Sequence, residues 1–305
     1  MSGQGVGDRA FFPPQVVVNV KALACELPKQ RGLPFSRLSH ADIAAEAISQ
    51  GIVGSISDMT VWRWLSADAI RPWCHRSWIF PRDPNFAAKA NPVLDLYNGV
   101  WKGEPLGPND YVISSDEKTS IQARKRIAPG TPPAAGQRRK VEEEYERMGA
   151  LAYLAAWDVH RAKLFGICTP TTGIDYFHKL VDLVMSQEPY RSAPRVFWIT
   201  DNGSSHRGES SVRRLKKWHP NAIQVHTPIH ASWLNQIEIY FSVVQRKVLT
   251  PNEFNSLTEL ENQIMSFQTY YKKVAQPFEW KFTKADLQRL LVKLDEQKAK
   301  QQAAA

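Results

Sequence analysis

Three acidic motifs, far apart along the chain, constrain this sequence more than any other feature. Residues 110–116 form a short apolar run that predicts a strand ending in Asp116. Residues 196–200 are β-branched or aromatic and predict a buried strand, which the turn-forming Asp201-Asn202-Gly203 ends. The third acid, Glu238, shares the polar face of a predicted helix with Asn235, while apolar residues recur at helical spacing behind it. Asp201 is thus expected at the C-terminal end of a strand, where open α/β sheets bind ligands.

Carboxylates gathered in one pocket repel each other, and each raises the pKa of its neighbours. A divalent cation relieves this repulsion, and hard oxygen ligands suit Mg²⁺ or Mn²⁺. Glu117 is the main alternative to Asp116 as the first acid. Each acid taken alone also has a structural interpretation, with Asp201 as a turn former and Glu238 as a solvated helix residue.

The charge of the chain favours an anionic partner. The 305 residues carry a formal net charge of +9, with a pI of about 9.4, and nucleic acid is the commonest partner of such proteins. The alternative is a protein that is merely basic. Three scattered cysteines predict neither a disulfide framework nor a zinc site. We find no signal peptide and no apolar run of about 18 residues, so we expect a soluble, cytoplasmic protein without membrane contact.

The hydrophobic pattern predicts an α/β domain with three consecutive strands, the last two forming a hairpin, and then helix, strand, helix, strand and helix. In chain order these elements are residues 110–116, 151–159, 163–168, 174–185, 196–200, 211–218, 222–227 and the Glu238 helix. Further helices are predicted at residues 91–101 and 257–274, and a last one ends at Leu294, after a short extended segment at 278–282.

The N-terminal part predicts helices, after a glycine-rich start at residues 1–13 that we expect to be disordered. A helix is expected over residues 14–27, and a capping-box start at Ser39 opens a second helix. A further capped start at Ser57 predicts a third helix. The second and third helices together suggest a helix-turn-helix, in which the third helix presents Thr60 and Arg63 to the major groove. The alternative is an ordinary helical pair.

Basic residues outside these helices are candidates for contacts with DNA phosphates. In the linker at residues 66–84 they are Arg71, Arg76 and Arg82. Two further groups flank a Pro- and Gly-rich loop at residues 128–136, and the alternative for them is a solvated flexible loop. They are Arg124, Lys125, Arg126, Arg138, Arg139 and Lys140.

Asp116, Asp201 and Glu238, in strand, strand and helix contexts, resemble the catalytic triad of DDE transposases, with the mariner-like insertion-sequence branch as the nearest. The resemblance covers about residues 20–294. It implies a ribonuclease-H-like mixed five-stranded sheet flanked by helices and preceded by a small all-α helix-turn-helix region. The implied domains are a DNA-binding region and linker at residues 1–84, a catalytic domain at 85–294 and a flexible tail at 295–305.

The resemblance also implies the activity, a metal-dependent cleavage and strand transfer at transposon ends. Asp116 would bridge two Mg²⁺ ions, for which Mn²⁺ can substitute, while Asp201 and Glu238 would each hold one. Asn202, His206 and Asn235 are candidates for supporting these ligands. The implied partners are the inverted repeats of the transposon and target DNA, bound by a homodimer that is associated with the bacterial nucleoid.

Members of this family usually carry another helix-turn-helix further upstream, and this chain is expected to begin in the connection between the two. That expectation keeps a second function open. The chain would then be a truncated, catalytically silent DNA-binding remnant, or a repressor of its own element.

Overall fold

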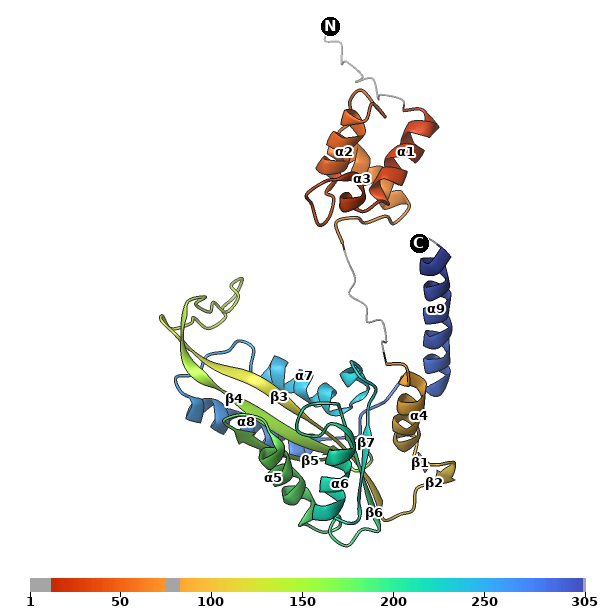
Figure 1. Ribbon diagram of the computed structural model, residues 1–305. Helices are drawn as coiled ribbons and strands as arrows, with labels where there is room; N and C mark the ends of the chain where they lie inside the picture. Colours follow the sequence, from red (N-terminus) through yellow and green to blue (C-terminus); the bar gives the residue numbers. More distant parts are fainter. Residues whose placement is uncertain (1–11, 75–82, 304–305) are drawn as a thin grey trace. The chain divides into compact units, whose positions relative to one another are not determined.

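The computed structural model describes residues 12–74 and 83–303, in two compact units, Met1–Ile79 and Phe80–Ala305 (Figure 1). Each unit has its own hydrophobic core, and each is described by itself below. The predicted disorder at the start of the chain and the predicted phosphate contacts of Arg76 and Arg82 lie outside the described residues.

The N-terminal unit contains three α-helices around one core. Their bounds are α1 Pro14–Ala24, α2 His40–Ser49 and α3 Asp58–Ala67, with a 3₁₀ turn at Pro28–Arg31. The hydroxyl of Ser39 accepts the Asp42 N–H, and the hydroxyl of Ser57 accepts the Thr60 N–H, so both predicted caps are formed. The core consists mainly of Val20, Leu23, Leu38, Ile43, Ala47, Val61 and Leu65.

A mixed five-stranded sheet forms the centre of the second unit, in the order β5-β4-β3-β6-β7. The strands are β3 Asp110–Arg126, β4 Tyr145–Asp158, β5 Lys163–Thr169, β6 Arg195–Thr200 and β7 Ala222–His226. β3, β4 and β5 are antiparallel neighbours, whereas β6 is parallel to both β3 and β7. This is the ribonuclease-H-like arrangement, and the predicted fold class is confirmed.

The structure corrects the position of Asp116 within its strand. Asp116 does not end a short strand, because β3 has 17 residues and pairs Asp116 with Ala155 of β4. The parallel pairing with β6, however, stops at Ser114 and Ile199. β6 ends one residue later, at Thr200, and Asp116 lies close to Asp201, the first residue after β6.

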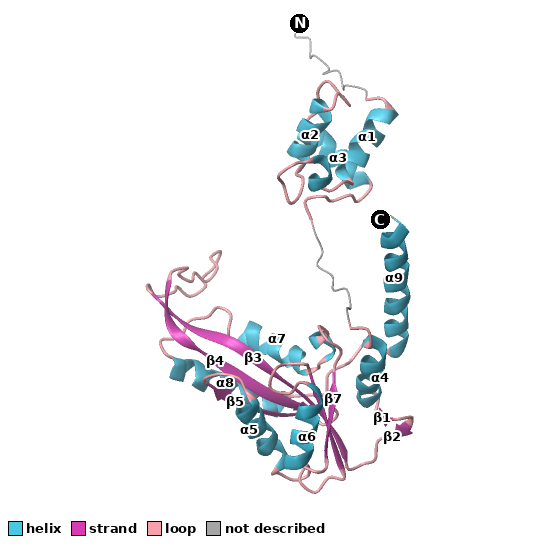
Figure 2. Ribbon diagram, viewed as in Figure 1, coloured by secondary structure: helices cyan, strands magenta, loops and turns pink. Residues whose placement is uncertain are grey.

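The pairing of β4 with β5 ends at Ala152 and Thr169, and beyond this point β3 and β4 continue as a two-stranded ribbon, which Figure 2 shows extending past the rest of the sheet. The pairing is irregular between Lys118 and Ile121, where Ser120 takes a positive φ of 55°, and then resumes as far as Arg126 and Tyr145. Arg124, Lys125 and Arg126 are therefore strand residues and not part of a loop. The local sequence of residues 117–126 does not predict this extension of the strand, because the extension depends on pairing with β4.

Helices cover both faces of the sheet. On one face, α5 Ile174–Met185 and α6 Gly208–Trp218 pack with Trp198 and Leu154 of the strands. On the other face, α7 Ile237–Lys247 and α8 Leu257–Val274 pack with Tyr153 and Trp157, and α4 Phe86–Tyr97 contributes Val93 and Leu96 to the same cluster. The two helices predicted at residues 174–185 and 257–274 are confirmed.

Several predicted boundaries are wrong. α4 begins at Phe86 and ends at Tyr97, and β1 Val100–Trp101 pairs with β2 Glu104–Pro105 where the helix was expected to continue. Gly99 and Gly103 allow this small hairpin with φ values of 72° and 88°. The last helix, α9 Lys284–Ala303, runs past Leu294 because Glu, Gln, Lys and Ala favour helix in the predicted tail. Residues 278–282 pair with no strand among the described residues.

No helix in the described ranges combines the length and the apolar character that a bilayer span requires.

We predict that Asp110 fixes the start of β3 against β6 in a pH-dependent way. The buried Asp110 carboxylate accepts the Gly107 N–H at 2.8 Å and two N–H groups of Arg195 at 3.0 and 2.5 Å. The Arg195 guanidinium lowers the pKa of Asp110, and burial opposes this only in part. Because Arg195 is 41% exposed, Asp110→Asn should cost only about 1–2 kcal/mol of unfolding free energy at pH 7.

A depressed folded-state pKa stabilises the protein above the ordinary pKa of about 3.9, and this contribution disappears as the pH falls through the folded value. Urea unfolding at pH 7 and pH 3 should therefore show a gap between wild type and Asp110→Asn that shrinks at low pH. An equal gap at both values would contradict the ion-pair account.

Candidate active site

Asp116 and Asp201 come together because of the strand register described above. Together with His206, each presents one ligand atom, and these atoms lie within 4.8 Å of one another. Asp116 is only 8% exposed, whereas the Asp201 side chain is 31% exposed. The pair therefore has a buried member and a member that solvent or a ligand can reach.

The turn after β6 holds the Asp201 carboxylate in place. Its Oδ1 accepts the Gly203 N–H at 2.7 Å and also contacts Nε2 of His206. A Cβ atom at position 203 would lie 3.0 Å from Asp201 Oδ1 and 3.0 Å from His206 Nε2. A side chain here would have to displace the acid or its histidine by a few tenths of an ångström, so glycine is favoured where this turn folds back on its own acid.

His206 lies between two acids and is fully buried. Its Nε2 faces Asp201, and its Nδ1 lies 3.1 Å from Ser205 Oγ and 3.7 Å from Glu117 Oε1. Burial alone would lower the pKa of His206, but the Asp201 hydrogen bond and the Glu117 charge outweigh it and raise the pKa. The imidazole is thus held as a donor to Asp201, and we assign it to orienting this acid.

Glu117 and Ser205 complete this chain of contacts and were not predicted as a pair. The Ser205 hydroxyl donates to Glu117 Oε1 at 2.7 Å. The sequence offered Glu117 as the main alternative to Asp116, and its side chain is only 10% exposed. The only signal in the sequence is the polar Ser204-Ser205-His206 run after Asp201, and turn chemistry explains such a run equally well.

The backbone of His206 is fixed from the β7 side. Its carbonyl oxygen accepts Gln224 Nε2 at 3.0 Å and lies 2.6 Å from His226 Nε2. Asn202, a predicted supporting residue, donates to the Thr227 carbonyl at 2.7 Å. Asn202 therefore ties the Asp201 turn to the end of β7, which is a structural contact.

The two acids have opposite pKa shifts. Burial and the neighbouring charge of Asp201 raise the pKa of Asp116 to about 8. Burial also opposes ionisation of Asp201, but the hydrogen bonds from His206 and Gly203 outweigh it and lower the pKa of Asp201. These shifts favour the charged form of Asp201 and the protonated form of Asp116.

Asn235 joins α7 to β3 beside Asp116. Its Nδ2 donates to the Ser115 carbonyl at 2.9 Å and lies 3.5 Å from Asp116 Oδ2, while its Oδ1 accepts the Ser114 hydroxyl. Ser114 Oγ in turn accepts the Ile237 N–H in the first turn of α7 at 2.8 Å. The N-terminus of α7 is thus fixed to the strand that carries Asp116.

Glu238 follows this clamp and lies in the first turn of α7. Burial raises its pKa, with a further contribution from the charge of Asp201, while the charge of Lys118 opposes the shift. The charge of Asp201 contributes to the raised pKa of Glu238, and the charge of Glu238 contributes in turn to the raised pKa of Asp116. Among the described residues, the tight group of ligand atoms contains His206 and not Glu238.

A cavity of about 480 Å³ opens directly beside Asp201. It is enclosed by the turn after β6 and by the loop before α7, and His230 in that loop has a positive φ of 61°. Its lining residues are Asp201, Asn202, Gly203, Arg207, Pro228, Ile229, His230, Ala231 and Ser232. The exposed edge of Asp201 therefore faces a space that can admit a ligand.

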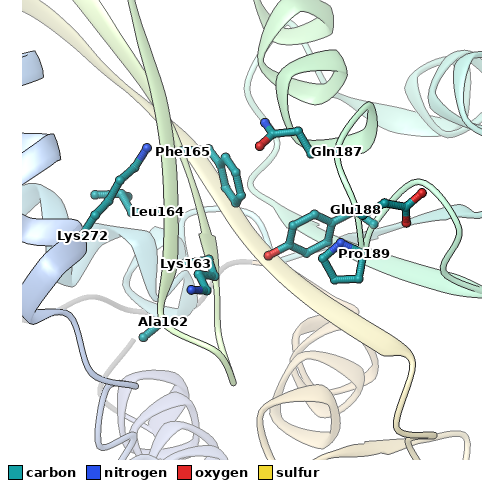
Figure 3. Close-up of a pocket in the computed structure, with 9 residues that line it drawn as sticks. Ala162, Lys163, Leu164, Phe165, Gln187, Glu188, Pro189 and Lys272 are labelled. Carbon is teal, nitrogen blue, oxygen red and sulfur yellow. The ribbon is translucent and has the colours of Figure 1, made fainter.

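A second cavity, of about 280 Å³, lies near the edge strand β5 (Figure 3). Phe165, Leu164 and Pro189 line it, with Lys272 on one side and Glu188 on the other. Glu188 is the only acid in this lining, and it already accepts Arg191 and Ser192. This cavity lacks the paired carboxylates of the first.

The donors at the first site fit a hard divalent cation. The two closest acids offer carboxylate oxygens, and burial together with the neighbouring charge of Asp201 raises the pKa of Asp116 to about 8. Mg²⁺ and Mn²⁺ prefer such oxygen ligands, and a bound cation would remove the repulsion. Asp116 and Asp201 are therefore the residues that could hold the metal.

The residues predicted to bind DNA fall into separate parts of the fold. In the N-terminal unit, Arg63 and Arg71 are exposed, whereas the Thr60 hydroxyl lies 2.9 Å from the Ser57 hydroxyl at the start of α3. In the second unit, Arg138 and Lys140 are exposed in the connection between β3 and β4.

The other basic residues that were predicted to bind DNA in this unit have protein partners. Lys125 pairs with Glu146 at 3.2 Å, and Arg139 with Glu253 at 2.7 Å. Arg126 donates to the Glu142 carbonyl at 2.6 Å, and Arg124 lies over the Tyr145 ring. These contacts account for part of the basic charge there without a nucleic acid.

Residues 111–261 match the family model of the DDE superfamily endonucleases. This segment holds Asp116, Asp201 and Glu238, and we conclude that it is a DDE superfamily endonuclease domain. The comparison with curated proteins found no match.

Several solved structures share the fold. The Mos1 mariner paired end complex with Mn is 14% identical, with a TM-score of 0.52 over 90% of this chain and 77% of that chain. The Mos1 transposase paired-end complex with left transposon end is also 14% identical, with a TM-score of 0.52 over 91% and 75%. The Mos1 Strand Transfer Complex is 13% identical, with a TM-score of 0.51 over 97% and 79%. At these identities the likeness establishes the ribonuclease-H-like fold.

We predict that Asn235→Ala loosens the site. The substitution leaves the Ser114 hydroxyl and the Ser115 carbonyl without their buried partner, which should cost about 1–3 kcal/mol of unfolding free energy. Urea unfolding measures this cost. Asn262→Ala is the matched control, because Asn262 is an exposed amide of α8, and this variant should unfold like wild type. An unfolding free energy for Asn235→Ala equal to that of wild type would show that this clamp is not needed.

Proposed function

We propose that this protein is a DNA transposase, which cleaves DNA at the ends of its element and joins the freed 3′ end to target DNA in a metal-dependent reaction. The observation that carries the proposal is the pair of crowded carboxylates, Asp116 on β3 and Asp201 directly after β6, in a ribonuclease-H-like sheet. The match to DDE superfamily endonucleases over the same residues supports it.

The cofactor we propose is Mg²⁺, with Mn²⁺ as a substitute, at two positions held by Asp116, Asp201 and Glu238. The Mos1 structures include complexes with Mn and with Mg, which supports this choice. When bound, such ions supply charge neutralisation, activation of the attacking water or 3′-hydroxyl and stabilisation of the leaving oxygen.

The protein's own residues keep these acids in register. His206 donates to Asp201 and so fixes the orientation of a carboxylate that is partly open to solvent. Asn235 holds the start of α7 against β3, which sets the position of Glu238 relative to Asp116. In phosphoryl transfer, such positioning accounts for much of the catalysis.

The proposed partner is double-stranded DNA, both the inverted repeats of the element and the target. The net charge of +9 supports it, as do the exposed Arg63, Arg71, Arg138 and Lys140. The Mos1 structures are described as paired-end and strand transfer complexes, which supports a homodimer that brings two ends together.

We predict metal-dependent nicking at the inverted repeats that flank the gene. Wild type with Mg²⁺ or Mn²⁺ should cut a labelled duplex that carries the repeat. Asp201→Asn, which keeps the size of the side chain and removes its charge, should reduce the rate at least a hundredfold, by about 2.7 kcal/mol or more. Asp175→Asn, at an exposed acid of α5, is the matched control and should cut like wild type.

Specific binding without nicking by the wild type would contradict the proposal and favour a DNA-binding remnant or repressor. Equal nicking by wild type and Asp201→Asn would show that the acids assigned here do not carry the reaction.

A further inference from the structure

We propose a second metal site, for Zn²⁺, between α5 and α6 and separate from the acid pair. Its ligands are His178 and Asp182 of α5 and His219, which directly follows α6. These three side chains each offer one ligand atom, and the atoms lie within 4.8 Å of one another. None of them belongs to the site assigned to DNA cleavage.

The geometry is close to what a tetrahedral zinc site needs. His178 and Asp182 are four residues apart, so they lie on the same face of α5. His178 Nε2 is 3.3 Å from Asp182 Oδ2, and His219 Nε2 is 2.8 Å from Asp182 Oδ1. Zinc lies about 2.0–2.2 Å from such ligands, which places neighbouring ligand atoms roughly 3.3 Å apart in a tetrahedron. Small side-chain rotations would let the three atoms meet one ion.

The surrounding residues hold the ligands in place. The His178 ring stacks on Trp218 with the ring centres 3.7 Å apart and an angle of 10° between the planes. Trp218 and Leu215 of α6 pack in the same hydrophobic cluster as Leu180 of α5. The two helices lie side by side on one face of the sheet (Figure 1), so the three ligands come from a rigid framework.

The donor set distinguishes this site from the first. Two imidazole nitrogens and one carboxylate favour Zn²⁺ or a related transition metal, whereas Mg²⁺ prefers oxygen ligands alone. The side chains of His178, Asp182 and His219 are 34%, 51% and 19% exposed, so an ion can reach them from solvent. Three protein ligands leave the fourth position for water.

A metal at this position would clamp two helices that each contact the acid site. Phe177 of α5 lies against the His206 ring, with the ring centres 5.1 Å apart. Arg214 of α6 donates to the Ser205 carbonyl at 2.8 Å. Because His206 orients Asp201, zinc would restrict the motion of the two helices that contact His206 and Ser205 behind that acid. The alternative is a plain His–Asp–His hydrogen-bond network without an ion.

Calorimetric titration of the full chain with ZnCl₂ tests the proposal. We expect one Zn²⁺ to bind with micromolar affinity or better to wild type and to Asp116→Asn, in which the acid pair is disrupted. Asp182→Asn and His219→Gln should each weaken this binding at least tenfold. His160→Gln, at a histidine that contacts the Leu96 carbonyl, is the matched control and should bind like wild type.

Co²⁺ provides a second measurement that reports on the ligands themselves. Its visible absorption should show a four-coordinate ion with nitrogen ligands in wild type and Asp116→Asn, and this band should disappear in His219→Gln. Thermal unfolding without metal should confirm that each variant is folded.

Three results would overturn the proposal. They are the absence of micromolar zinc binding in wild type, zinc affinity unchanged in both Asp182→Asn and His219→Gln, and binding that is lost in Asp116→Asn but kept in His219→Gln. The last of these would assign the zinc to the acid pair.

Discussion

The repulsion between two carboxylates that the fold forces together is the constraint on which this structure depends. β3 and β6 run in parallel only as far as Ser114 and Ile199, and the next residues of each chain segment lead to Asp116 and Asp201. Burial and the charge of Asp201 raise the pKa of Asp116 to about 8. Burying a carboxylate next to another acid costs folding free energy, whereas apolar side chains at the same positions would not carry this cost. Stability alone therefore does not explain the pair. The arrangement fits the cation that we propose for this site.

Much of the surrounding structure serves to hold these acids in spite of their repulsion. His206 donates to Asp201, and its own raised pKa reflects the acids on both sides of it. Asn235 and Ser114 link α7 to β3 through buried hydrogen bonds. These hydrogen bonds fix the first turn of α7, which carries Glu238, to the strand that carries Asp116. Rigid support of this kind is what phosphoryl transfer requires, because its catalysis rests on positioning.

The sequence predicted the five strands and most of the helices around them, because each has a clear period and polar ends. The ends of β3 and α4 were wrong. The length of β3 depends on pairing with β4, and the end of α4 depends on a glycine hairpin, so neither is determined by local pattern. Asp201 was expected at a strand end and lies there. Asp116 was placed at the end of its own strand, although it lies at the end of its pairing with β6.

The contacts between Glu117, Ser205 and His206 were beyond the reach of sequence reasoning. They depend on a turn that folds back over the neighbouring strand, and no periodic pattern reports such a contact. The same holds for His178, Asp182 and His219, since the first two share a helix face but the third joins them only through the packing of α5 on α6. The catalytic roles of Asp116, Asp201 and Glu238 stay predictions that rest on the geometry.

Anomalous diffraction from crystals grown with Mn²⁺ tests the central claim most directly. The account predicts a strong Mn²⁺ peak in direct contact with carboxylate oxygens of both Asp116 and Asp201. A structure in which Mn²⁺ binds elsewhere, while the two acids remain close together without an ion between them, would contradict it.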